Sequence, residues 1–198
     1  MKTRRKNKKS KNKTKKTYRK KDYQSGEGML TSVWGPSLWH TLHTISFNYP
    51  VKPTKEQKKH HKNLILNLKY TMPCKYCRIN LRKNLKAHPL RQCDLKDRDK
   101  FSKWVYGLHE HVNKMLGKKS GLTFCEVRDR YENFRSRCTK KEIKNKIIKI
   151  KSKKKTRKKE KGCTEPFYGK KAKLCLKIVP QENRMKTFQM DKKVIKSR

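Results

Sequence analysis

The sequence predicts an all-α fold, a compact bundle of four to five helices with basic N- and C-terminal extensions that we expect to be disordered. Two observations favour it. Apolar residues in the middle of the chain recur every three or four positions, and no stretch shows the sustained alternation of a half-buried strand. All three tryptophans and five of the seven cysteines lie within residues 29–138. The folded domain is therefore placed there.

Proline and capping residues mark the predicted helices. The first starts near Pro36, which suits a first helical turn, and ends before Pro50. Thr54 can cap the second helix, whose buried side would carry Leu64, Ile65 and Leu68. The remaining helices are predicted from about Cys74 to Ala87, from Asp99 to Leu116 with Gly117 as terminator, and from Thr123 to Arg135.

Composition divides the chain into four parts. Residues 1–28 are basic and nearly free of large apolar side chains, so they cannot offset the entropy of ordering and are predicted to be a disordered tail. The helical domain spans residues 29–138, and a Lys-rich linker follows at 139–161. Residues 162–198 form a small C-terminal element with two cysteines and a β-like run from Leu174 to Val179.

The chain carries 59 Lys and Arg against 15 Asp and Glu, a formal net charge of +44 at pH 7. This excess predicts electrostatic contact of the extensions with nucleic acid or another polyanion. No apolar run is long enough to span a bilayer, and the basic N-terminal region lacks the apolar stretch of a secretory signal. We therefore expect a cytosolic protein that is not secreted and has no transmembrane segment.

The segment MPCKYC places Cys74 and Cys77 at C-x-x-C spacing, where a helix is predicted to start. A helix N-terminus stabilises a thiolate, which suits a redox-active pair. The spacing also serves zinc sites, because Cys74, Cys77, His88 and Cys93 form an acceptable ligand set, C-x2-C-x10-H-x4-C. Beside basic extensions, that set indicates a zinc-stabilised nucleic-acid-binding module. The motif alone leaves both interpretations open.

Two further pairs of residues share helix faces. Trp39 and His43 are four positions apart in the first helix, and His109 and Asn113 are four apart in the fourth. Aromatic and imidazole rings with an Asn donor suit a large planar cofactor with hydrogen-bonding edges, such as a flavin. A zinc site leaves this set without a role, so the set favours the redox interpretation.

Several motifs together resemble, in order and spacing, the Erv/ALR family of FAD-dependent sulfhydryl oxidases. They are W-x-x-L-H at 39–43 with Y-P at 49–50, P-C-x-x-C at 73–77, L-R-K-x-L with H-P at 81–89, F-x-x-W at 101–104, L-H-x-x-V-N-x-x-L-G-K at 108–118 and F-C at 124–125. The resemblance covers about residues 34–131. The W-G-P opening and the basic extensions are most similar to members from large DNA viruses.

The resemblance implies a helical bundle that holds FAD, usually as a homodimer. Cys77 would lie against the isoalloxazine ring and reduce it, and Cys74 would exchange with a protein dithiol substrate. FAD would pass the electrons to O2, giving H2O2. Tyr131 stands where the family usually has a Trp. The positions expected to contact FAD are Trp39, His43, Tyr49, His109, Asn113, Lys118 and Tyr131.

The chain departs from the family pattern around the expected cofactor site. It reads HEHVN where the family commonly reads H-N-x-V-N, so Glu110 is expected to alter one hydrogen bond to the cofactor. Tyr106 replaces a cysteine that in non-viral members bridges to the position of Cys125. That bridge cannot form here, and Cys125 could pair instead with Cys138.

Three cysteines remain outside these motifs. Cys163 and Cys175 are the candidate shuttle pair of the resemblance, with a local structural disulfide or two free thiols as equal alternatives. Cys93 is expected to be a free thiol.

By resemblance, the protein would form disulfides in viral structural or membrane proteins during assembly, in the host cytoplasm or in the virion. We expect this oxidase to use no metal. Two alternatives stay open: the zinc-stabilised nucleic-acid-binding module, and a degenerate oxidase that binds FAD but has lost turnover through Glu110.

Overall fold

Helices make up nearly all the regular structure of the described chain, which in this computed structural model comprises residues 20–24, 26, 28–139, 162–168, 171–191 and 193–194. The all-α prediction is confirmed for the main domain. A short helix, α1, covers Lys20–Gln24. The bundle is built from α2 (Thr31–Phe47), α3 (Lys55–Thr71), α4 (Lys75–Ala87), α5 (Arg98–Met115) and α6 (Phe124–Glu132).

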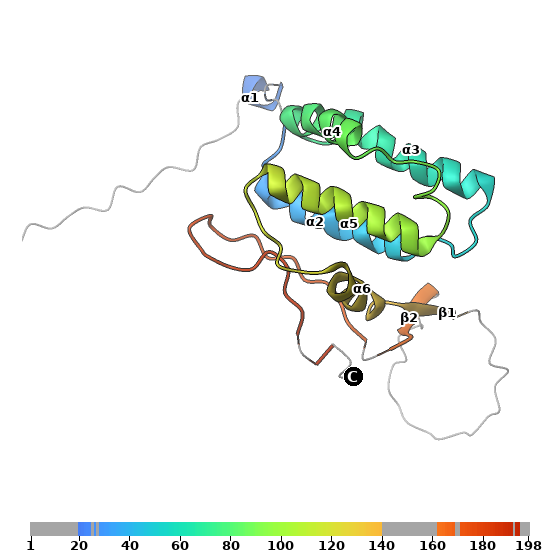
Figure 1. Cartoon of the computed structure of the whole chain (residues 1–198). Coiled ribbons are helices and arrows are strands. Elements are labelled where there is room, and N and C mark those ends of the chain that lie inside the picture. The colour runs from blue at the N-terminus through green and yellow to red at the C-terminus, as the bar shows by residue number, and fades with distance from the viewer. Residues whose placement is uncertain are drawn as a thin grey trace, which may run out of the picture.

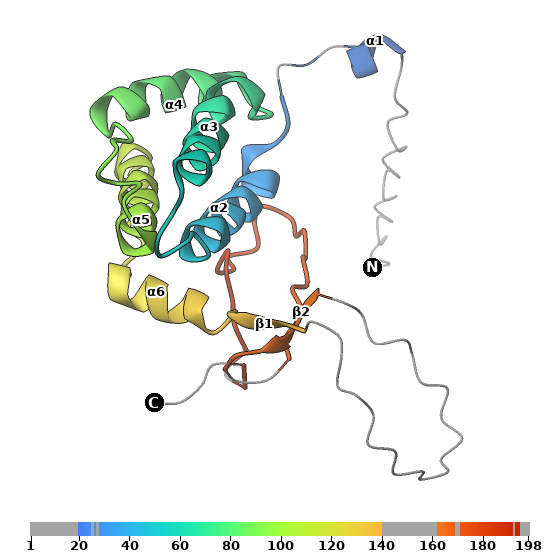
Figure 2. The same cartoon turned by 90° about the vertical axis from the view of Figure 1, so that its right-hand side faces the viewer.

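The bundle has two layers of paired helices and one helix beneath them. α2 and α5 lie side by side, with α3 and α4 above them and α6 below (Figure 1). In the perpendicular view, α2 to α5 surround one core and α6 crosses beneath (Figure 2). Residues of this core come from all four of these helices, from the segment that follows α2 and from the α4–α5 loop: Leu42, Tyr49, Ile65, Leu81, Leu90, Leu95, Phe101, Trp104, Val105 and Leu108.

Capping residues fix where the helices begin. Thr54 and Thr123 each accept an N–H bond from three residues further on, and the side chain of Gln57 or Glu126 bonds back to the capping residue. Asp97 caps α5 with its side chain alone, which accepts the backbone N–H three residues further on. At the other end of α5, Gly117 has a positive φ of 66°, which confirms its prediction as a terminator.

The predicted first helix and one predicted buried face need correction. α2 begins at Thr31, so Pro36 lies inside the helix rather than in its first turn. Leu64, predicted to be buried, is 38% exposed, because α3 turns Ile65 and Leu68 toward the core instead.

A two-stranded sheet joins the helical domain to the C-terminal element. β1 (Ser136–Thr139) pairs antiparallel with β2 (Gly162–Pro166), with a bulge between Arg137 and Thr139. The predicted β-like run from Leu174 to Val179 is wrong, since residues 171–180 form neither helix nor strand. Its alternate apolar residues stay exposed and gain no core face that would support a strand.

The predicted extensions fall largely outside the described residues. Of the tail at 1–28, the described part includes α1 and Gly28, and residues 140–161 of the predicted linker are outside. Within the described ranges, no helix is long and apolar enough to cross a membrane.

Tyr49 lies in the core at the end of α2, although its position was expected to contact FAD. Its side chain is fully buried and donates its hydroxyl to the Leu95 carbonyl at 3.0 Å. The rings of His61 and Phe101 pack around it. Tyr49 therefore ties the end of α2 to the loop before α5.

Removing this hydroxyl should weaken the fold. We expect Tyr49→Phe to lower the free energy of unfolding by about 1 kcal/mol, because the buried Leu95 carbonyl loses its donor. Urea denaturation measures the change. The matched control is Tyr70→Phe, whose ring is 61% exposed; equal losses in both variants would contradict the structural role of Tyr49.

Candidate active site

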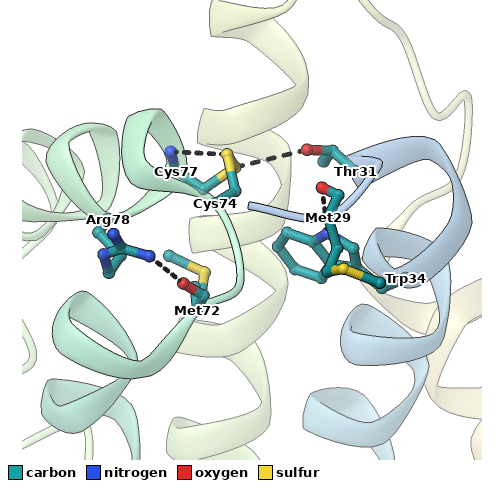
Figure 3. Close-up of a disulfide and its surroundings, with 7 residues drawn as sticks. All are labelled: Met29, Thr31, Trp34, Met72, Cys74, Cys77 and Arg78. Carbon is teal, nitrogen blue, oxygen red and sulfur yellow. Dashed lines mark hydrogen bonds between the residues drawn. A yellow bond between two sulfur atoms is a disulfide. The ribbon is translucent and has the colours of Figure 1, made fainter. Parts of the chain in front are cut away.

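The two cysteines of MPCKYC are joined in a disulfide at the N-terminus of α4 (Figure 3). Their Cα atoms are 5.2 Å apart, within the usual range for a disulfide. Cys74 is the N-cap residue of α4, and its sulfur accepts the N–H of Cys77 at 3.1 Å. The helix therefore directs its positive end toward the sulfurs, which favours the thiolate formed on reduction.

The ligands of the zinc alternative do not come together. Two of them are held in this disulfide, and His88 instead lies 3.2 Å from the Trp104 carbonyl and stacks on the Trp104 ring. Cys93 is a free, exposed thiol, as expected. Among the described residues, no group of three or more His, Cys, Asp or Glu side chains could hold a metal ion.

Helices α2 and α5 bring Trp39, His43 and His109 into one cluster. The Trp39 and His109 rings are nearly parallel, at 7°, with centroids 4.0 Å apart. His43 Nε2 lies 3.0 Å from His109 Nδ1, so one of the two nitrogens donates and the other accepts. The cluster combines stacking surfaces with imidazole hydrogen-bonding groups.

Helix α6 adds Tyr131 to this cluster. Its ring stacks on Phe47 at 5.2 Å and lies 5.3 Å from His43. Its hydroxyl lies 3.2 Å from Nδ1 of His40, a residue that sequence reasoning missed. The signal was present, because His40 precedes His43 by three positions and shares its face of the helix.

Two other predicted site residues lie at the C-terminal end of α5. Asn113 is half-buried and donates from Nδ2 to Glu110 Oε1 at 3.0 Å. Lys118 is exposed, and its backbone N–H donates to the Asn113 carbonyl at 2.8 Å. Glu110, the departure from the family pattern, is thus a partner of Asn113. Tyr49 is not part of this group.

Burial sets the electrostatics of the imidazole pair. It lowers the pKa of His43 from 6.5 to about 3, with smaller effects from His109 and His40. It also lowers the pKa of His109 to about 4, partly opposed by Glu110, and it raises the pKa of Tyr131. All three groups are neutral at pH 7. His43 Nδ1 is buried without a hydrogen-bond partner.

The predicted pairings of the other cysteines are not formed. Cys125 is free and exposed, so the expected pair of Cys125 with Cys138 is wrong. In place of the family bridge, the hydroxyl of Tyr106 donates to the Leu122 carbonyl at 2.7 Å, tying α5 to the segment before α6. Cys163 takes part in a disulfide, whereas Cys175 is a free thiol, so the candidate shuttle cysteines are not joined to each other.

The neutral imidazole pair predicts a loss of stability in acid. Because both folded pKa values lie below 6.5, the unfolded chain binds more protons between about pH 4 and 6.5. The contribution of the two neutral histidines to folding stability is full above pH 6.5 and is lost as the pH falls toward their folded pKa values of about 4 and about 3. Between pH 7 and 5 we expect the free energy of unfolding to fall by on the order of 4 kcal/mol, roughly half from each histidine, measured by urea denaturation without added FAD.

Two variants test the assignment of this effect. His109→Gln should make the pH dependence shallower, while His60→Gln, which changes an exposed histidine of α3, should leave it as in the parent. The same slope in all three proteins would refute the role of the buried pair.

The chain matches one protein family and is similar to several known proteins. The model of the Erv1 / Alr family matches residues 36–137. The chain is similar to the probable FAD-linked sulfhydryl oxidase R368 of Acanthamoeba polyphaga mimivirus, with 35% identity over 94 residues, covering 48% of this chain and 65% of that protein. It is 36% identical over 84 residues to the FAD-linked sulfhydryl oxidase ERV1 of Arabidopsis thaliana, covering 42% of each chain.

A third relative is matched over most of its length. The FAD-linked sulfhydryl oxidase of African swine fever virus (isolate Tick/Malawi/Lil 20-1/1983) is 32% identical over 99 residues, which cover 50% of this chain and 80% of that protein. Among solved structures, the yeast Erv1 core is 24% identical with a TM-score of 0.48, covering 62% of this chain and 96% of that one. The chain spans less than two thirds of the length of the mimivirus and Arabidopsis relatives. The family model covers half of this chain, and the chain therefore belongs to the Erv1/Alr family.

Proposed function

We propose that the protein is an FAD-linked sulfhydryl oxidase that forms disulfides in protein thiols and passes the electrons to O2. The observation that carries this proposal is the Cys74–Cys77 disulfide at the start of α4, in a chain of the Erv1/Alr family. The mimivirus, African swine fever virus and Arabidopsis relatives are all named as FAD-linked sulfhydryl oxidases.

The aromatic and imidazole cluster fits FAD. His43 Nδ1 is buried and lacks a partner, which suits a polar group of a ligand. The neutral rings of Trp39 and His109 offer stacking surfaces to a planar ring system. When bound, FAD would supply a two-electron acceptor that reacts with O2 to give H2O2. The residues proposed to hold it are Trp39, His43, His109, Asn113, Lys118 and Tyr131.

The two cysteines carry out the thiol–disulfide step. A substrate thiolate attacks the sulfur of Cys74, and the Cys74–Cys77 bond breaks to leave Cys77 as a thiolate. The second thiol of the substrate then attacks the mixed disulfide, which releases the oxidised substrate and leaves both cysteines reduced. The start of α4 helps this exchange because its N–H groups and dipole favour the thiolate forms.

The surface beside the disulfide suits a protein substrate. Tyr76, which lies between the two cysteines in sequence, is 70% exposed. Met29 and Leu30 are also exposed, and the Met29 N–H bonds to the carbonyl of Pro73, next to Cys74. Exposed apolar side chains at a reactive centre are typical of a protein-contact surface. We propose dithiol-bearing proteins as the substrates.

The remaining proposals concern assembly and location. Following the family resemblance, we propose that the oxidase acts as a homodimer. From the same resemblance we propose a role in disulfide formation during virus assembly, in the host cytoplasm or in the virion; two of the similar proteins come from viruses.

The oxidase function has a direct optical test. The purified full chain should show a flavin absorption band that bleaches with dithiothreitol under anaerobic conditions and returns when air is admitted. Cys77→Ala should prevent the bleaching and lower the rate of thiol oxidation by roughly 100-fold or more. Cys93→Ala, at a free exposed thiol, should change neither. A colourless protein that contains zinc would support the alternative nucleic-acid-binding module.

We also propose that the folded domain contributes to contact with nucleic acid. A groove of about 560 Å³ is lined mainly by four lysines of α3. They are Lys55, Lys58, Lys59 and Lys62, and Asn63 and Gln92 complete the lining. The i, i+3, i+4, i+7 spacing places these ammonium groups on one face of α3, which concentrates positive charge that attracts a polyanion.

Salt dependence tests this contact. Lys58→Gln/Lys62→Gln in the full chain should lower the slope of log affinity for duplex DNA against log salt by about 2, one unit for each lost phosphate contact. The control, Lys83→Gln/Lys86→Gln on α4, removes the same charge from another helix. Equal changes in both double variants would show that only net charge matters.

A further inference from the structure

A short segment before α2 lies directly against the redox disulfide. We call residues 28–30 the N-terminal strap. Gly28 forms an antiparallel bridge with Cys74, and the N–H of Met29 donates to the Pro73 carbonyl at 2.7 Å. The Met29 carbonyl in turn accepts the indole N–H of Trp34 at 3.0 Å. The strap is thus fixed at one end to the cysteine motif and at the other to its own helix (Figure 3).

This close approach requires glycine at position 28. A Cβ there would lie 2.5 Å from the Pro73 carbonyl oxygen and 2.8 Å from the Cys74 Cα, both closer than real Cβ contacts. Both neighbours are backbone atoms, so no side chain could move aside. Any larger residue would push the strap away from Cys74.

The docked strap places the hydroxyl of Thr31 3.6 Å from the sulfur of Cys77. Because this sulfur is part of a disulfide, it carries no hydrogen, and Thr31 must be the donor. The two sulfurs therefore have different donors. Cys74 accepts from the backbone N–H at the start of α4, and Cys77 accepts from a side chain of α2.

We propose that Thr31 stabilises the Cys77 thiolate that forms when the disulfide is opened, and that the N-terminal strap holds Thr31 in place for this role. The proposal rests on the thiol–disulfide exchange of the proposed function.

The exchange step balances without any further reactant. The substrate thiolate forms a bond to the Cys74 sulfur while the Cys74–Cys77 bond breaks, and the electron pair of that bond stays on Cys77. The substrate sulfur is oxidised to the mixed-disulfide level and Cys77 is reduced. The Thr31 hydroxyl keeps its proton and shares it with the new anion, and a better stabilised thiolate leaves faster.

The test measures the reactivity of Cys77 in the absence of its disulfide partner. In a Cys74→Ser background, Cys77 is the only thiol of the pair, and serine is a good N-cap for α4. Full-length protein is alkylated with iodoacetamide across a pH series, and modification of the Cys77 peptide is followed by mass spectrometry. Only the thiolate reacts, so the midpoint of the rate profile reports how strongly the anion is stabilised.

Three variants separate the hydroxyl from the packing. Thr31→Val should raise the midpoint by roughly one pH unit, because the anion loses a hydrogen bond. Thr31→Ser should restore it. Thr41→Val is the matched control on the same helix, since its hydroxyl donates to the Ser37 carbonyl, and it should leave the midpoint unchanged.

A fourth variant tests the strap itself. Gly28→Ala retains Thr31 but displaces the strap, so it should raise the midpoint as Thr31→Val does. Gly26→Ala is the control for backbone strain, because Gly26 shares a positive φ with Gly28 (108° and 155°) but its Cβ would meet nothing within 4 Å. It should leave the midpoint unchanged. Circular dichroism checks that each variant is folded.

Two outcomes would overturn the proposal: an unchanged midpoint in Thr31→Val, or a shift in that variant that Thr31→Ser fails to restore. The alkylation assay needs neither FAD nor O2. Failure of the oxidase function would therefore show in the optical test, separately from a failure of this inference.

Discussion

The site depends on the way helix α4 begins. Cys74 caps this helix with its sulfur, which also bonds covalently to Cys77 in the first turn. The helix start and the reactive disulfide are therefore one unit, and the helix dipole acts on the atoms that react. The segment before α2 packs against the same unit through Gly28 and Met29, so two helix N-termini meet at one pair of sulfurs. Reduction of the disulfide would release a thiolate where hydrogen-bond donors are already present.

The second part of the site depends on desolvation. α2 and α5 pack closely enough to bury His43 and most of His109, and α6 closes the cluster with Tyr131. Burial keeps these groups neutral, so the cluster presents aromatic surfaces and neutral imidazole donors and acceptors rather than charge. The C-terminal segment also reaches the edge of this cluster, where Phe188 packs on His40 at 5.4 Å. A buried imidazole nitrogen without a partner is costly in the protein alone, which accords with a ligand that would satisfy it.

A hydrogen bond of Tyr106 connects α5 to the start of α6, where the family resemblance implies a disulfide in non-viral members. The family resemblance led us to expect a cysteine where Tyr106 stands, and the structure shows the Tyr106 hydroxyl bound to the Leu122 carbonyl, with its ring against Phe124. The tyrosine thus connects α5 to the start of α6 and leaves Cys125 free. Arg135 makes a further connection, donating to the Phe47 carbonyl at the end of α2 and to Glu132. Polar contacts of this kind position α6, and with it Tyr131, beside the imidazole pair.

The sequence by itself determined the helical class, most of the helix limits, the redox pair and the stacking residues. These follow from local rules: capping at Thr54 and Thr123, termination at Gly117, and i, i+4 spacing that puts Trp39 and His43 on one face. The tertiary structure decided what depends on contacts between distant segments. It placed Tyr49 in the core and Leu64 at the surface, paired β1 with a strand 23 residues further along the chain rather than forming the expected run at 174–179, and brought Gly28 and Thr31 to the disulfide. No periodicity encodes these outcomes, because each depends on which surfaces the packed helices leave available for burial and hydrogen bonding.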